Sequence, residues 1–190
     1  MDAKLVLNIF IFIFLIILFY YIATSGEMNY VKSNIDGHFY TVRKDSGDKV
    51  GAADMLAKIN SRVLILLQKL KEEVHNDSEK RENVRILISK YNPRKLMEKP
   101  VNSKYPAFSI NKGQKIYICV RDNNTGNVSK DINTVMYVMI HELAHVMTKS
   151  TGHTEQFWEN NNFLLKKAKK FRLYSENNNK KYCGTHINKN

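Results

Sequence analysis

The chain has 190 residues, a formal net charge of +12 and a sequence pI near 9.6. This length accommodates one soluble domain of about 150 residues together with an appendage. So basic a chain is attracted to nucleic acid, anionic lipid headgroups or acidic protein surfaces. However, its lysines and arginines are spread along the sequence, and it contains no recognisable nucleic-acid-binding module and no internal repeat. We therefore expect a solvated basic surface, and binding to nucleic acid stays open.

The N-terminal segment Leu5–Ala23 is almost entirely apolar. As a helix it would span about 28 Å, close to the roughly 30 Å hydrocarbon core of a bilayer. Tyr20 and Tyr21 lie at one end, where membrane interfaces favour aromatic rings. We predict an uncleaved single-pass transmembrane anchor over residues 1–24, and therefore a membrane localisation. The alternative is a cleavable signal peptide, for which Ala23-Thr24-Ser25 offers a cleavage site.

The remainder of the chain is predicted to be a polar spacer over residues 25–35 followed by one domain over 36–190. Apolar periodicity and turn residues predict, in chain order, a strand, two helices, a β-hairpin and two further helices. These elements are expected at 38–43, 48–74, 78–91, 107–111 with 115–121, 131–147 and 155–174. The predicted fold class is therefore α+β, with a short mixed or antiparallel sheet over the helix at 131–147.

That helix carries the most informative motif, in which His141 and His145 are four residues apart and Glu142 follows the first. Histidines at this spacing lie on one face of a helix, so both rings can bind one ion. Glu142 is then beside the metal and can accept a proton from bound water. His153 follows after a predicted turn at Gly152 and completes a three-ligand site with one open position.

Three imidazole ligands favour Zn²⁺ as the cofactor. If His153 is not the third ligand, the next candidates are Glu155, Glu159 and His186. The two cysteines, Cys119 and Cys183, fit no paired-cysteine zinc motif. A disulfide between them can form in an oxidising environment, but free thiols are the preferred interpretation.

The segment from His141 to Trp158 resembles the WLM/SprT-like zinc metallopeptidases, a branch of the zincins, and most closely the small membrane-anchored versions encoded by large DNA viruses. The closer match is supported by Asn111–Arg121, Asp131–Thr134 and Tyr182–Gly184. The resemblance covers roughly residues 91–187. The seven residues between His145 and His153 exceed the common WLM spacing and fall short of the SprT spacing.

This resemblance implies a zincin fold and a hydrolase that cleaves protein or peptide substrates with Glu142 as the general base. It also implies that a strand, here 115–121, offers its edge to the substrate. Phe157 and Trp158 are expected to hold His153 in place by packing. The candidates for the hydrogen-bond donor to the oxyanion are Tyr105, Tyr117, Tyr174, Tyr182 and Arg121, and the sequence does not select one of them.

Two alternative functions stay open. One is a non-catalytic, zinc-stabilised membrane or virion protein, although folding alone does not require the carboxylate of Glu142. The other is a protease that clears proteins from DNA, an activity that the resemblance associates with WLM and SprT-like proteins and that a basic domain would suit. An anchor in the host or virion membrane argues against the second alternative. The sequence does not indicate an oligomeric state.

Overall fold

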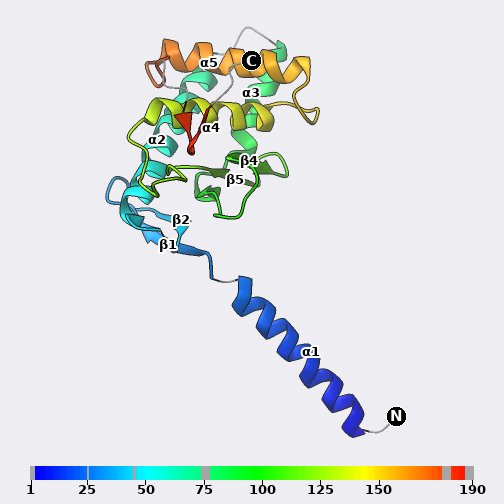
Figure 1. Cartoon of the computed structure of the whole chain (residues 1–190). Coiled ribbons are helices and arrows are strands. Elements are labelled where there is room, and N and C mark those ends of the chain that lie inside the picture. The colour runs from blue at the N-terminus through cyan, green and yellow to red at the C-terminus, as the bar shows by residue number, and fades with distance from the viewer. Residues whose placement is uncertain (1–2, 25, 45, 74–77, 177–180, 187–190) are drawn as a thin grey trace.

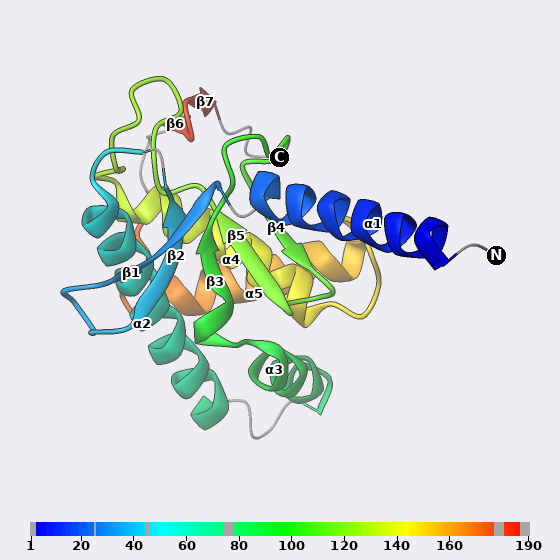
Figure 2. The ribbon, with the colours of Figure 1, turned by 90° about the horizontal axis from the view of Figure 1, so that it is seen from below.

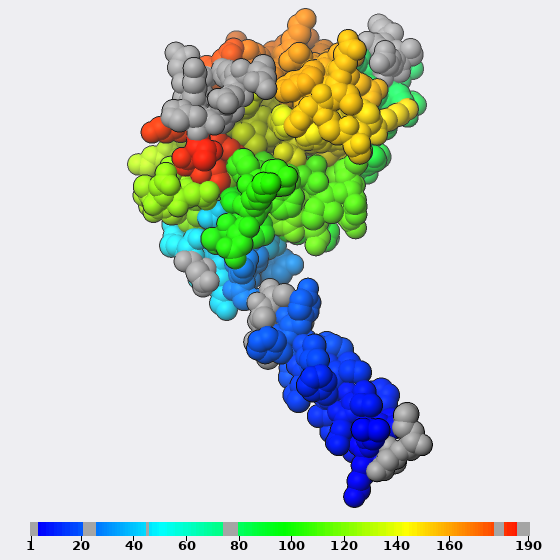
Figure 3. Space-filling view, turned by 45° about the vertical axis from the view of Figure 1, so that its right-hand side comes forward, coloured from blue at the N-terminus to red at the C-terminus, as the bar shows by residue number. Residues whose placement is uncertain are grey.

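The computed structural model in Figure 1 describes residues 3–24, 26–44, 46–73, 78–176 and 181–186. The first helix, α1 (Ala3–Thr24), extends away from a body that the other elements form together (Figures 1 and 3). The helix predicted at the N-terminus therefore forms. Its large apolar side chains between Leu5 and Tyr20 are mostly exposed.

The prediction of a membrane anchor at the N-terminus is not supported by the structure. A helix that crosses a bilayer needs about 20 consecutive, predominantly apolar residues. In the part of the chain that the structure describes, no helix combines the length and the apolarity required for a crossing. The transmembrane anchor predicted within residues 1–24 and the predicted membrane localisation are therefore wrong.

Five short strands form one mixed sheet in the order β1-β2-β3-β5-β4. Their bounds are Met28–Lys32 for β1, Phe39–Arg43 for β2, Leu96–Glu98 for β3, Ala107–Ile110 for β4 and Lys115–Ile118 for β5. β1 is antiparallel to β2, β3 is parallel to both of its neighbours, and β4 is antiparallel to β5. The hairpin β4–β5 forms as predicted, with β4 at the edge of the sheet and β5 inside it.

The helices of the body lie on one side of this sheet (Figure 2). They are α2 (Lys49–Glu73), α3 (Ser78–Lys90), α4 (Ile132–Met147) and α5 (Glu155–Lys170). In Figure 1, α4 lies between the sheet and α5. Because α4 is covered on both sides, apolar side chains at three- and four-residue spacing are fully buried, among them Val135, Met139 and Leu143. The predicted α+β class is confirmed.

Two short strands were not predicted in these positions. β1 lies within the predicted spacer 25–35 and pairs along its whole length with β2, so this segment is not a loop. β3 has only three residues, all of them buried, in a segment for which no strand was predicted. A strand of three residues shows no periodicity, and its partners Thr41 and Ile116 are remote in sequence.

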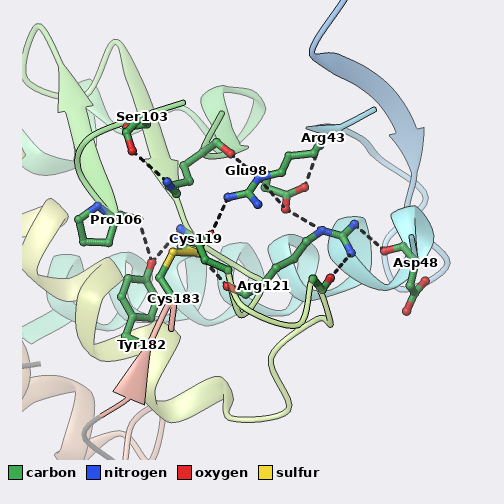
Figure 4. A network of polar contacts seen from close by, with 12 residues as sticks. Arg43, Asp48, Glu98, Ser103, Pro106, Cys119, Arg121, Tyr182 and Cys183 are labelled. Atoms are coloured by element: carbon green, nitrogen blue, oxygen red, sulfur yellow. Dashed lines mark hydrogen bonds and ion pairs between the residues drawn. A yellow bond between two sulfur atoms is a disulfide. The ribbon is translucent and has the colours of Figure 1, made fainter. Parts of the chain in front are cut away.

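A buried cluster of charges joins β2, β3 and the segment after β5 to the residue that precedes α2 (Figure 4). Oε1 of Glu98 lies 2.8 Å from Nε of Arg121 and 3.6 Å from Nε of Arg43. Oε2 of Glu98 accepts the backbone N–H of Arg43 at 2.8 Å, and Arg121 also donates to the carbonyl oxygens of Asp48 and Gly126. Buried charges are tolerated when they are paired and hydrogen-bonded in this way. The guanidinium of Arg121 therefore has a structural role, because its hydrogen bonds hold the fold together.

The end of the described chain folds back onto the sheet as a small hairpin, β6 (Lys181–Tyr182) with β7 (Thr185–His186). Its turn carries Cys183, which forms a disulfide with Cys119 after β5 (Figure 4). The hydroxyl of Tyr182 accepts the backbone N–H of Cys119 at 2.8 Å. The preferred interpretation of free thiols is therefore wrong, because the hairpin returns to the end of β5 and brings the two sulfur atoms together.

Candidate metal centre

Helix α4 sets the positions of the first two histidines. Asp131 caps the helix, since its Oδ1 accepts the backbone N–H groups of Asn133 at 3.0 Å and Thr134 at 3.1 Å. One helical turn separates His141 from His145, so their rings project from the same face, with centroids 5.0 Å apart. The predicted pair of histidines is therefore brought together by local helix geometry alone.

The end of α4 and the loop that follows bring in the third histidine. The hydroxyl of Thr148 donates a hydrogen bond to a carbonyl of the last helical turn at 2.7 Å. It also accepts a hydrogen bond from the side-chain amide of Asn160 in α5 at 3.0 Å. The chain then turns at Gly152, whose φ of +80° lies in the left-handed region that favours glycine. His153 follows, immediately before Thr154 caps α5.

The three histidines converge. One potential ligand atom from each of His141, His145 and His153 lies within 4.8 Å of the other two. Nε2 of His153 is 3.1 Å from Nε2 of His141. No other group of three or more potential metal-ligating residues occurs in the described parts of the chain. The structure thus assembles one candidate metal centre, from the residues that the sequence motif predicts.

Aromatic side chains of α5 pack against this cluster. The ring of Phe157 is fully buried, and its centroid lies 4.3 Å from that of His145 and 4.8 Å from that of His153. The ring of Trp158 stacks on that of His153, with centroids 5.6 Å apart. These contacts agree with the supporting role predicted for the two aromatic residues, since they restrict the ring of His153.

Glu142 lies next to the histidines in a buried position, with only 4% of its surface exposed. Burial raises the pKa of its carboxyl group to about 7, and a hydrogen bond from Ser109 of β4 opposes this effect. Its Oε2 atom has no hydrogen-bond partner among the residues that the structure describes. A buried carboxylate oxygen left without a partner is unfavourable, and it is available to a group that enters the site.

The electrostatic surroundings also suit metal binding. Burial, together with repulsion from neighbouring imidazoles, lowers the pKa of both His141 and His145 to about 4. Both side chains are therefore neutral at pH 7. Neutral imidazole is the form that binds a metal ion, because its unprotonated nitrogen carries a free lone pair.

A cavity of about 670 Å³ lies over the histidines and Glu142. Its walls include β4, through Phe108 and Ser109, and the loop at 150–153. The segment 115–121, predicted to offer its edge to the substrate, does not lie at an edge of the sheet. β5 lies inside the sheet, where β3 and β4 occupy its two edges, whereas β4 lies at the end of the strand order and borders the cavity. An internal strand cannot add a further strand, so the prediction that 115–121 offers a free edge is wrong, and β4 is the edge strand beside the cavity.

Among the five candidates for the oxyanion donor, Tyr105 lines the cavity. The other four do not. Tyr182 is buried and bonded to the backbone next to β5, and Arg121 is held by Glu98. Tyr117 stacks on Phe108, while Tyr174 is buried beside Tyr137. Sequence patterns alone carried no signal that separates these residues, because their exposure depends on the tertiary fold.

Among the residues that the structure describes, neither His38 nor the alternative third ligands Glu155 and Glu159 belong to the cluster. Glu155 and Glu159 are exposed, and Glu159 lies 3.8 Å from Nζ of Lys80. His38 is exposed and lies 3.5 Å from a carboxylate oxygen of Asp36. The residue His75 and the side chain of His186 lie outside what the structure describes.

An α+β fold that places three histidines around one point, with a buried glutamate beside them, defines a candidate metal-dependent hydrolase. The model of the WLM domain family matches residues 36–189 of this chain. The chain belongs to the WLM domain family. Membership supports a protease-like function.

Relatives of the chain occur in large DNA viruses. The uncharacterized protein R325 of Acanthamoeba polyphaga mimivirus is 33% identical over 190 residues, which cover 97% of this chain and 95% of that protein. The uncharacterized protein 136R of Invertebrate iridescent virus 6 is 35% identical over 101 residues, which cover 51% and 56% of the two chains. The resemblance to WLM proteins of large DNA viruses is therefore confirmed.

The fold is also similar to a solved structure. The crystal structure of Wss1 from Saccharomyces cerevisiae superimposes with a TM-score of 0.51 over 70% of this chain and 88% of that chain. Sequence identity over this match is 19%. At such low identity the match shows that the two chains share a fold.

Proposed function

We propose that this chain is a zinc-dependent metallopeptidase, in which His141, His145 and His153 hold the metal and Glu142 is the general base. The observation that carries the proposal is the convergence of three imidazoles within 4.8 Å beside a buried carboxylate oxygen that lacks a partner. WLM family membership supports the same activity. Peptide-bond hydrolysis is the reaction that this set of groups suits best.

The donor atoms fit zinc. Nitrogens that each lie about 2.0–2.1 Å from a tetrahedral ion are separated from one another by about 3.3 Å. The 3.1 Å between Nε2 of His141 and Nε2 of His153 is close to this value. Three protein ligands leave one position free, as in catalytic sites. When bound there, zinc would supply a Lewis acid and a water molecule of lowered pKa.

Glu142 provides the proton transfers. Its buried position raises its proton affinity, so the carboxylate accepts a proton from the attacking water near neutral pH. Oε2 is the atom without a partner and is therefore the acceptor. The same oxygen then gives the proton to the amine that leaves when the peptide bond breaks. Ser109 holds the carboxyl group in place through its hydrogen bond.

Strand β4 provides a surface for the substrate. It forms the edge of the sheet and borders the cavity that contains the histidines. An extended peptide that adds to this edge would be held mainly through its backbone, with little selection for sequence. Phe108, which stacks on Tyr117 and lines the cavity, offers an apolar contact to one substrate side chain.

The proposal is tested by metal removal. We expect the purified full chain to cleave casein or a fluorogenic peptide, and dialysis against a chelator to lower the rate by at least about 10²-fold, because the Lewis acid contributes several kcal/mol to the transition state. One equivalent of Zn²⁺ should restore the rate. A metal-free protein that retained the original rate would refute the zinc-dependent mechanism.

His153→Ala tests the third ligand. We expect zinc affinity to fall by more than the roughly 10–100-fold typical of outer-shell changes, because a direct ligand is lost. The measurement is competition with a chromophoric chelator. His38→Ala is the matched control, since His38 is exposed and lies outside the cluster. Wild-type zinc affinity in His153→Ala would assign the third ligand to another residue.

A further inference from the structure

The turn between β4 and β5 packs closely against the end of helix α4. Gly113 in this turn has a φ of +100°. A Cβ atom on Gly113 would lie 3.0 Å from both Cγ atoms of Val146, so the turn can approach the helix this closely only with glycine at this position. Val146 directly follows His145. Lys112 in the same turn lines the cavity of the three histidines, so the turn lies next to the candidate metal centre.

From this turn, Lys112 reaches to the loop that follows α4. Its Nζ atom donates to the carbonyl oxygens of Thr148 at 2.7 Å and Lys149 at 2.8 Å, and also to that of Ser150. Thr148 is the C-cap of α4, at the end of the helix that carries partial negative charge, so a cation is favourable there. An ammonium group has three protons, and all three are used in these bonds.

The backbone of Lys112 has a φ of +52°, in the left-handed region. That conformation is unfavourable for a lysine and is readily adopted by glycine. The structure thus places a lysine where the backbone favours glycine. An unfavourable backbone conformation beside a candidate site indicates that the side chain has a role there.

We propose that Lys112 is a positioning residue for the third metal ligand. By binding three consecutive carbonyl groups it fixes the backbone at 148–150, and so fixes where His153 lies relative to His141 and His145. The loop needs such support because residues 149–152 are exposed and contribute little apolar packing. This inference rests on the proposed zinc site.

Two observations distinguish positioning from a direct role in the reaction. Lys112 lines the cavity, but its three protons are already donated to carbonyl groups of the loop, so none is left for a substrate. In addition, a lysine that acted only through its charge would repel a zinc ion, and its removal would strengthen zinc binding. A positioning role predicts instead that removal of Lys112 weakens zinc binding.

The test is the zinc affinity of the full chain, measured by competition with a chromophoric chelator. We expect Lys112→Met, which keeps the aliphatic length and removes the donors, to bind zinc roughly 10–100-fold more weakly than wild type. Lys149→Met is the matched control, because it removes a positive charge from the exposed side of the same loop. Its zinc affinity should stay within about twofold of wild type.

Lys112→Gly separates positioning from general stability. Glycine adopts a φ of +52° readily, so this variant should fold with an apparent melting temperature of the metal-free protein close to that of wild type. It should nevertheless show the same loss of zinc affinity as Lys112→Met. A residue that only stabilised the fold would change the melting temperature and the zinc affinity together.

The outcomes distinguish this inference from the proposed function. If the wild-type chain binds no zinc, the proposed function itself is wrong. If the wild type binds zinc and the two Lys112 variants bind it equally well or more tightly, the zinc site stands and the positioning role of Lys112 is overturned. Weaker binding in both Lys112 variants, with Lys149→Met unchanged, supports the inference.

Discussion

Replacement of Glu142 by Gln is expected to abolish peptide hydrolysis and to leave zinc binding intact. The amide has the shape of the carboxyl group but cannot accept the proton of the attacking water, and a general base typically contributes about 10²–10⁴-fold to the rate. Because burial already favours the neutral form of this side chain, the neutral glutamine should not disturb the fold. The three histidines that hold the metal are unchanged.

The measurement is kcat/KM on a fluorogenic peptide, with zinc content determined on the same samples by elemental analysis. Glu155→Gln is the matched control, since it makes the same chemical change at an exposed position two residues after His153. It should retain the wild-type rate. If Glu142→Gln cleaved the peptide as fast as the control, Glu142 would not be the base.

Loss of the disulfide is expected to lower the free energy of unfolding by about 4 kcal/mol. The bond joins Cys119 to Cys183 across a sequence separation of 64 residues. Closing a loop of that length lowers the conformational entropy of the unfolded chain, which stabilises the folded state by about this amount. Reduction of the wild type and the variant Cys183→Ala should produce the same decrease. The measurement is the midpoint of denaturation in urea, with and without reductant.

The double variant Cys119→Ala/Cys183→Ala serves as the control for this experiment. It should be no less stable than Cys183→Ala alone, and reductant should not change its midpoint. If reductant also left the midpoint of the wild type unchanged, the bond between the two sulfur atoms would contribute nothing to stability in solution, and the hairpin β6–β7 would be held by Tyr182 and its neighbours alone.

The parts of the fold that depend on neighbouring residues could be predicted from the sequence. Helix α4 was predicted at 131–147 and runs over Ile132–Met147, because its apolar stripe and the cap at Asp131 are local signals. The convergence of His141 and His145 follows from the helical repeat. His153 joins them because Gly152 turns the chain one residue earlier.

Features that depend on distant residues could not be predicted. Whether β4 or β5 forms the edge of the sheet is decided by β3, a strand of three residues that pairs in parallel with β5. The bonds from Lys112 to the loop after α4 bring together residues 36 to 38 positions apart. No residue pattern within either segment indicates this approach, since it depends on how the hairpin packs on the helix.

The N-terminal segment shows a different limit. The apolar run from Leu5 correctly predicts a helix, because side chains of this kind are compatible with helical backbone over a long stretch. The further step from an apolar helix to a membrane anchor was contradicted. Helix formation is a local property of the chain, whereas the surroundings of the helix are not.

The disulfide also determines what a break in the backbone would do. Residues 120–182 contain both helices around the metal centre, all three histidines and Glu142. Scission of any single peptide bond within this stretch would yield two polypeptides that stay linked through sulfur. A molecule nicked at the exposed loop 149–152, by its own activity or by another protease, would therefore migrate as one full-length species until a thiol reagent separated the halves.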